Sequence, residues 1–142
     1  MKIKTFIKNL LIIITSLFLY SSGPDAGTLN DSEDSFSTAE TLFTDGMYAM
    51  AAREFENFVS IYPLSGRIPE ARYYIAETNF RLKNPSEVIK IADIMEKESP
   101  SSPFTIKALV LKGKAYEQTG EQDKARLSLE RMLKRYGSGE SA

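Results

Sequence analysis

Residues 113–137 read GKAYEQTGEQDKARLSLERMLKRYG, and this stretch decides the fold. A glycine opens it, a second glycine follows at position 120, and apolar residues then recur at positions 125, 129, 132 and 133. This spacing places the apolar side chains on one face of a helix. The stretch therefore predicts two helices joined by a tight turn at Gly120, where a positive φ costs glycine little.

The same columns recur twice upstream, at a shift of 37 residues. A small residue, a turn residue and an apolar residue that fills space hold equivalent positions in the three units: Ala39, Ala76 and Gly113; Gly46, Lys83 and Gly120; Phe55, Ala92 and Leu129. Small residues let paired helices approach closely, and no run alternates long enough to predict a strand. We expect an all-α fold, an α-α solenoid of three helix pairs at about 37–63, 68–100 and 103–137.

Two prolines, each preceded by a polar residue, mark expected helix starts. Asn84-Pro85, with Glu87 three residues after the asparagine, predicts a capping box at the second helix of the middle unit. Ser102-Pro103 predicts the start of the third unit.

The composition excludes most familiar active sites. The chain of 142 residues has no histidine and no cysteine, which removes the commonest general base, thiolate nucleophiles and most zinc ligands. With 18 Lys+Arg against 19 Asp+Glu, it lacks the positive charge of a nucleic-acid-binding protein. We therefore expect no metal, no cofactor, no nucleic-acid partner and no enzymatic activity.

The N-terminus predicts export. Three lysines before residue 9 precede an apolar run of 11 residues at positions 10–20, which is too short to span a membrane comfortably. We expect a signal peptide at 1–26, cleaved after Ala26, an acidic flexible linker at 27–36 and a flexible tail at 138–142. The product would be periplasmic, outer-membrane-associated or secreted. A buried core helix and an uncleaved anchor are the alternatives for the apolar run.

The repeating columns resemble tetratricopeptide repeats. The third unit is clearest, with Gly113-Lys114-Ala115-Tyr116 followed at the family's intervals by Gly120, Ala125 and Leu129. The link from Tyr62-Pro63 to Ala71, followed by Tyr73-Tyr74-Ile75-Ala76-Glu77, is similar to a bacterial envelope subgroup. That subgroup includes the C-terminal domain of the Tol-Pal cell-division coordinator and the lipoprotein of the outer-membrane barrel-assembly complex.

This resemblance implies an exported scaffold or adaptor that binds a protein or peptide partner in the bacterial cell envelope. In such repeats the first helix of each pair lines the concave side of the stack. The matching positions make these the candidate partner-binding residues: Phe43, Tyr73, Glu77, Phe80, Arg81, Lys107 and Lys114. Packing between repeats is the competing interpretation for Tyr73, Tyr74 and Phe80, and a solvated face is the competing one for the charged residues.

Two other functions stay open at this point. One is a binder of a small ligand or a peptidoglycan fragment. The other is a cell-wall hydrolase that uses a pair of carboxylates such as Glu70 and Glu77. The last helix, with Leu127, Leu129 and Leu133, also predicts an apolar edge that a partner or a second copy of the chain would cover.

Overall fold

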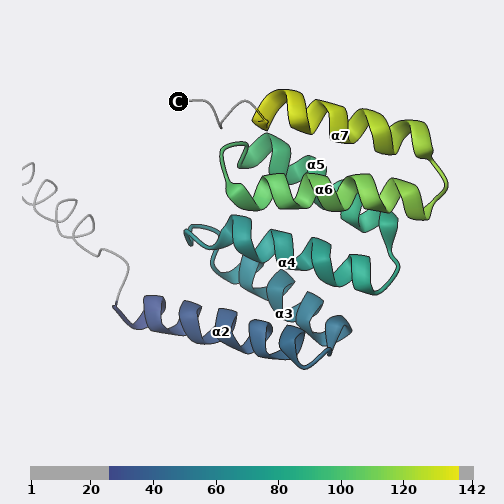
Figure 1. Cartoon of the computed structure of the whole chain (residues 1–142). Coiled ribbons are helices and arrows are strands. Elements are labelled where there is room, and N and C mark those ends of the chain that lie inside the picture. The colour runs from purple at the N-terminus through teal and green to yellow at the C-terminus, as the bar shows by residue number, and fades with distance from the viewer. Residues whose placement is uncertain (1–25, 138–142) are drawn as a thin grey trace, which may run out of the picture. The chain divides into compact units, whose positions relative to one another are not determined.

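The computed structural model describes residues 26–137, and the expected signal peptide up to Asp25 and the expected tail at 138–142 lie outside this range (Figure 1). Its six helices are α2 (Ala26–Thr44), α3 (Tyr48–Ile61), α4 (Ile68–Arg81), α5 (Pro85–Glu98), α6 (Pro103–Gln118) and α7 (Gln122–Tyr136). No strand occurs between residues 26 and 137. The residues from Ser32 onward form one compact unit, which is the unit described below.

The helices stack as three pairs, which confirms the predicted all-α solenoid. Helices α3, α5 and α7 begin 37 residues apart, the period seen in the sequence. Helices α2, α4 and α6 lie toward the reader in Figure 1, and α3 and α5 lie behind them. Each pair therefore contributes its first helix to the same side of the stack.

The turns within the pairs fall at the predicted positions. Gly46, Lys83 and Gly120 all adopt a left-handed backbone, with φ of 76°, 61° and 78°. Glycine tolerates this conformation readily, whereas a lysine is strained there by about 1–2 kcal/mol. The middle pair thus keeps the turn geometry of its neighbours without their glycine.

The predicted helix starts are correct, but one of the two caps is wrong. Helix α5 begins at Pro85, yet the Asn84 side chain makes no capping bond and instead donates to Oδ1 of Asn79 at 3.3 Å. Helix α6 begins at Pro103, where the Ser102 hydroxyl accepts a hydrogen bond from the Phe104 backbone N–H at 3.2 Å.

The linker expected at 27–36 is helical in the structure. Helix α2 begins at Ala26, so the first pair starts earlier than residue 37. Ser32 and Phe36 are buried, and the Phe36 ring lies 5.3 Å from the Phe55 ring and 5.2 Å from the Phe58 ring, centroid to centroid. The acidic composition of residues 27–36 predicted a flexible linker, but Phe36 at its end packs against the Phe55 and Phe58 rings of α3.

The small-residue column permits close packing, as predicted. Ala39 and Ala76 are fully buried, and Gly113 is buried against α7. A Cβ added at Gly113 would stand only 2.8 Å from Cδ2 of Leu129. A larger residue at this position would therefore force the Leu129 side chain of α7 to move.

Phe55 is the position at which truncation should harm the fold most clearly. Its side chain is fully buried, so Phe55→Ala should lower the free energy of unfolding by about 3–5 kcal/mol. Ile61→Ala is the matched control, because Ile61 lies on the same helix with 64% of its surface exposed. Urea denaturation followed by circular dichroism measures both. Equal losses for the two variants would contradict the assigned core.

Candidate interaction face

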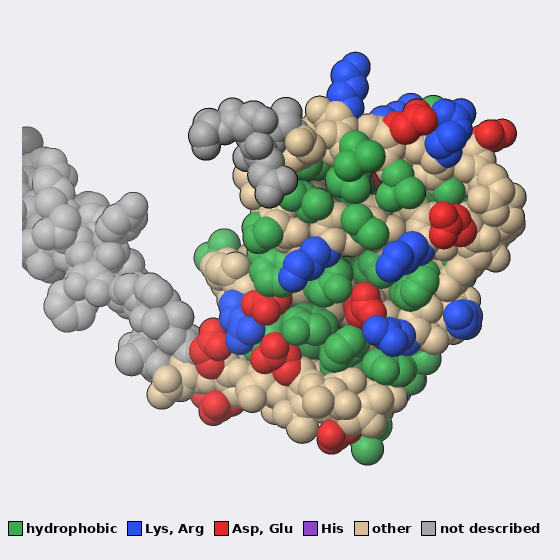
Figure 2. Space-filling view, in the orientation of Figure 1, with side chains coloured by type: hydrophobic (Ala, Val, Ile, Leu, Met, Phe, Trp, Pro, Cys, Tyr) green, Lys and Arg blue, Asp and Glu red, His purple; other side chains and the backbone are tan. Residues whose placement is uncertain are grey.

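The candidate partner-binding residues come from α2, α4 and α6, and we call the surface that these helices form the α2–α4–α6 face. Phe43 lies on α2, four of the seven residues lie on α4, and Lys107 and Lys114 lie on α6. Figure 2 shows this side of the molecule, with hydrophobic side chains gathered over α4 and α6 and with side chains of both charges among them. The face therefore offers apolar contact area interrupted by charge.

A chain of contacts along α4 forms the centre of the face. The Tyr73 hydroxyl donates to the Glu77 carboxylate at 3.4 Å, and Nη2 of Arg81 lies 2.8 Å from Oε1 of the same carboxylate. These residues are spaced four apart, so they follow one stripe of the helix. The Glu77 side chain is only 12% exposed, whereas that of Arg81 is 51% exposed. Arg81 is thus held by Glu77 and still available to a partner.

The contacts continue from α4 to α6. The Nζ atom of Lys107 lies 5.6 Å from the centroid of the Tyr73 ring and 5.0 Å from that of the Phe104 ring. The two rings are themselves 6.0 Å apart. Lys107 therefore rests over an aromatic pair that bridges two repeats, in the geometry of a cation–π contact.

The other candidates are placed less centrally. Phe43 is half-buried, with its ring 5.1 Å from that of Tyr74, and Phe80 is half-buried, with Nζ of Lys83 5.9 Å from its ring. Both rings pack against the core and are also partly exposed on the face. Lys114 is exposed and forms no ion pair with any residue of the range 26–137.

Two residues outside the predicted set organise this face. The Tyr74 ring stacks on Phe55 with centroids 4.9 Å apart and an interplanar angle of 2°. The guanidinium carbon of Arg67 lies 3.4 Å above the Phe36 ring, and its nitrogens lie 2.9 Å from Glu33 and 3.0 Å from Glu70. Tyr74 adjoins a predicted residue, but Arg67 lies in a connection outside the helical pattern, where no periodicity marks it.

Burial and acidic neighbours make Tyr74 harder to ionise. The pKa of Tyr74 is raised above its ordinary value of about 10, and desolvation is the largest cause. The negative charges of Glu40 and Glu70 raise this pKa further, as does a hydrogen bond that the Tyr74 hydroxyl donates to Glu40 at 3.4 Å. Desolvation and Glu77 raise the pKa of Tyr73 in the same way. Tyr73 and Tyr74 therefore stay neutral up to a higher pH than a solvated tyrosine does.

The arrangement offers little for catalysis. Glu70 and Glu77, the carboxylate pair considered for hydrolysis, are each paired with an arginine, Arg67 at 3.0 Å and Arg81 at 2.8 Å. In the part of the chain that the structure describes, no three Asp or Glu side chains come together as a metal site. None of the helices α2 to α7 has both the length and the hydropathy needed to cross a bilayer.

The raised pKa of Tyr74 predicts a loss of stability at high pH. An unfolded tyrosine ionises near pH 10, while the folded domain keeps Tyr74 protonated, so the free energy of unfolding should fall as the pH rises through 10. Tyr74→Phe keeps the stacked ring but cannot ionise, so the fall between pH 9 and pH 11 should be smaller. Urea denaturation at the two pH values measures it. Identical falls in the variant and the unmodified protein would contradict the assignment.

One family comparison matches the third helix pair. Residues 107–138 match the model of the tetratricopeptide repeat family, a range that contains most of α6 and all of α7. A comparison with curated proteins gives no match. The family match supports a tetratricopeptide repeat protein, with the third helix pair as the matched repeat.

Proposed function

We propose that this protein is an exported scaffold that binds a protein or peptide partner of the bacterial cell envelope through the α2–α4–α6 face. A tetratricopeptide repeat suggests a scaffold for protein–protein interaction, and such repeats are typically non-catalytic. The observation that carries the proposal is the contact chain of Arg81, Glu77, Tyr73 and Lys107, which links α4 to α6.

The chemistry of this contact chain suits a partner with both apolar and acidic groups. Aromatic and arginine side chains are the commonest anchors of protein interfaces, and here they are held in place before a partner arrives. Glu77 restrains Arg81, and the Tyr73 and Phe104 rings support Lys107. Because little ordering remains to be done on binding, less conformational entropy is lost.

Export to the envelope is the second part of the proposal, and two features of the sequence support it. Lysines at positions 2, 4 and 8 precede the apolar run at 10–20, and the connection that begins at Tyr62-Pro63 resembles that of envelope tetratricopeptide proteins. A cell-envelope partner, associated with the outer membrane or with division, follows from this resemblance.

Crosslinking from the face tests the binding role. A photoreactive amino acid at position 107 should give a discrete adduct in cells, and Arg81→Glu should reduce its yield on the order of tenfold, because it replaces an anchor with a repelling charge. Mass spectrometry identifies the adduct. Position 90 is the control, since Lys90 is exposed on α5, behind the face in Figure 1. The same adduct from position 90, or one that survives Arg81→Glu, would contradict the assigned face.

Fractionation of cells tests export separately. The mature protein should be released when the outer membrane is permeabilised, and its first residue should be Gly27 because cleavage is expected after Ala26. N-terminal peptide mass spectrometry of each fraction measures this. A product that retains Met1 and stays with the cytoplasmic fraction would refute the envelope role, while the binding face could still stand.

A further inference from the structure

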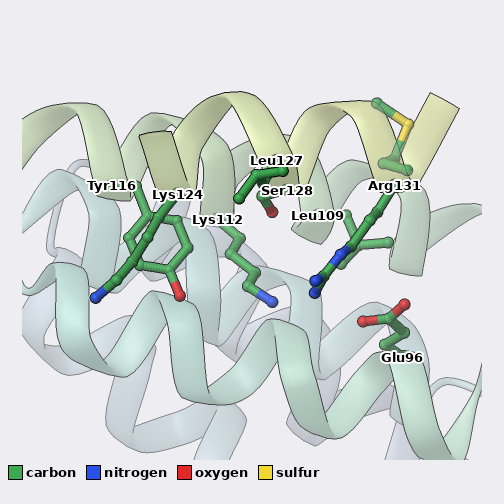
Figure 3. A pocket seen from close by; sticks show the side chains of 9 residues that line it. Glu96, Leu109, Lys112, Tyr116, Lys124, Leu127, Ser128 and Arg131 are labelled. Carbon is green, nitrogen blue, oxygen red and sulfur yellow. The ribbon is translucent and has the colours of Figure 1, made fainter. Parts of the chain in front are cut away.

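A hollow of about 300 Å³ lies between α5, α6 and α7, away from the α2–α4–α6 face (Figure 3). Three cationic side chains reach it, Lys112 from α6 and Lys124 and Arg131 from α7. The Tyr116 ring and Ser128 also line it, and Glu96 of α5 supplies a carboxylate opposite Arg131. The hollow is therefore bordered mainly by groups that donate hydrogen bonds or carry positive charge.

The equivalent junction between the first and second pairs is built from different residues. Positions 37 residues earlier than Lys112, Ser128 and Arg131 hold Ile75, Ile91 and Ile94. Ile75 and Ile91 are 6% and 9% exposed, so both are packed into that junction. At three of the positions that line the hollow, the third pair therefore carries a lysine, a serine and an arginine where the second pair carries isoleucines.

The positive charges around the hollow are unequally compensated. Nζ of Lys112 lies 2.5 Å from Asp93, Lys124 is paired with Glu121, and Glu96 is paired with Arg135 at 3.2 Å. Arg131 is exposed and forms no ion pair with any residue in the range 26–137. Lys112 and Lys124 are thus compensated within the protein, and Arg131 is the cation of the hollow whose guanidinium is left to pair with an anion.

The apolar residues that line the hollow indicate which chemical group is attached to the anion. Leu109, Leu127 and Met132 give the hollow an apolar side next to its cationic rim. A volume of about 300 Å³ is at the small end of the range for organic ligands. An arginine binds a carboxylate through two parallel hydrogen bonds, and the Lys112 side chain lies next to Arg131 in the hollow (Figure 3).

We propose that this hollow binds a carboxylate carried on a short aliphatic stem. The carboxylate contacts Arg131, with Lys112 beside it, and the stem lies against Leu109 and Met132. A small fatty or amino acid, and an aliphatic residue at the carboxyl end of a peptide, both have this chemistry. The site is separate from the interaction face and does not depend on what that face binds.

Binding of simple probes to the full chain tests the site. Hexanoate should shift the backbone amide resonances of Tyr116 and Ser128 in a saturable way, whereas hexanol, which lacks the charge, and inorganic phosphate, which lacks the stem, should shift them far less. Arg131→Gln should weaken hexanoate binding at least about tenfold by removing the bidentate partner. Arg126→Gln is the matched control, because Arg126 lies on the same helix, paired with Glu130 outside the hollow, and should leave hexanoate binding unchanged.

Three results would overturn the proposal. If hexanoate does not shift the amide resonances, the hollow does not bind it. If hexanol or phosphate shifts them equally, the hollow does not recognise a carboxylate on an aliphatic stem. If Arg126→Gln weakens hexanoate binding as much as Arg131→Gln does, the binding reflects general charge screening. Circular dichroism of the Arg131→Gln variant checks that its fold is intact. A short peptide ending in leucine, tested with a free and with an amidated carboxyl end, then separates a peptide terminus from a free acid. Stronger binding than hexanoate by the free-ended form alone assigns the terminus.

Discussion

The stacking of Tyr74 on Phe55 is the contact on which the arrangement of the first two pairs depends. It joins α4 to α3, and the edge of the same tyrosine meets Phe36 of α2 at 6.1 Å. Adjacent residues on a helix point about 100° apart, so fixing Tyr74 inward also fixes the direction of Tyr73. The stripe that continues through Glu77 and Arg81 then follows on the outer surface. The orientation of the interaction face is therefore a consequence of core packing.

The charged residues are distributed unevenly along the stack. Residues 27–100 hold 7 cationic and 13 acidic side chains, whereas residues 101–136 hold 8 and 4. Between the first and second pairs, the Arg67 guanidinium lies over the Phe36 ring and forms ion pairs with Glu33 and Glu70. In the third pair, cations border an open space. The first two pairs thus carry an excess of acidic side chains, and the third pair carries an excess of cationic ones.

The parts of the fold that depend on local sequence could be predicted, and those that depend on distant contacts could not. The period, the turns at Gly46 and Gly120 and the helix starts at Pro85 and Pro103 are set by neighbouring residues. The burial of Phe36 against α3 depends on a tertiary contact that no local pattern shows. The Asn84 cap failed because a nearby amide competed for its side chain.

The candidate site follows the same division. The resemblance to tetratricopeptide repeats selected the helix, and the spacing of four then grouped Tyr73, Glu77 and Arg81 on one stripe. The role of Arg67 required the tertiary structure, because its partners include a residue 34 positions away. The hollow left a trace in the sequence, namely the replacement of three isoleucines by lysine, serine and arginine one period later. That trace has meaning only once two of the isoleucines, Ile75 and Ile91, are known to be buried.

The unequal filling of the two junctions has a mechanical consequence. In a linear array each unit is stabilised only by its immediate neighbours, so cooperativity is as strong as the weakest coupling between them. The stack of Tyr74 on Phe55 fills the first junction, whereas the hollow leaves part of the second junction unfilled. A ligand that filled the hollow would add contacts between α5, α6 and α7 and would therefore couple the last pair more tightly to the rest of the stack.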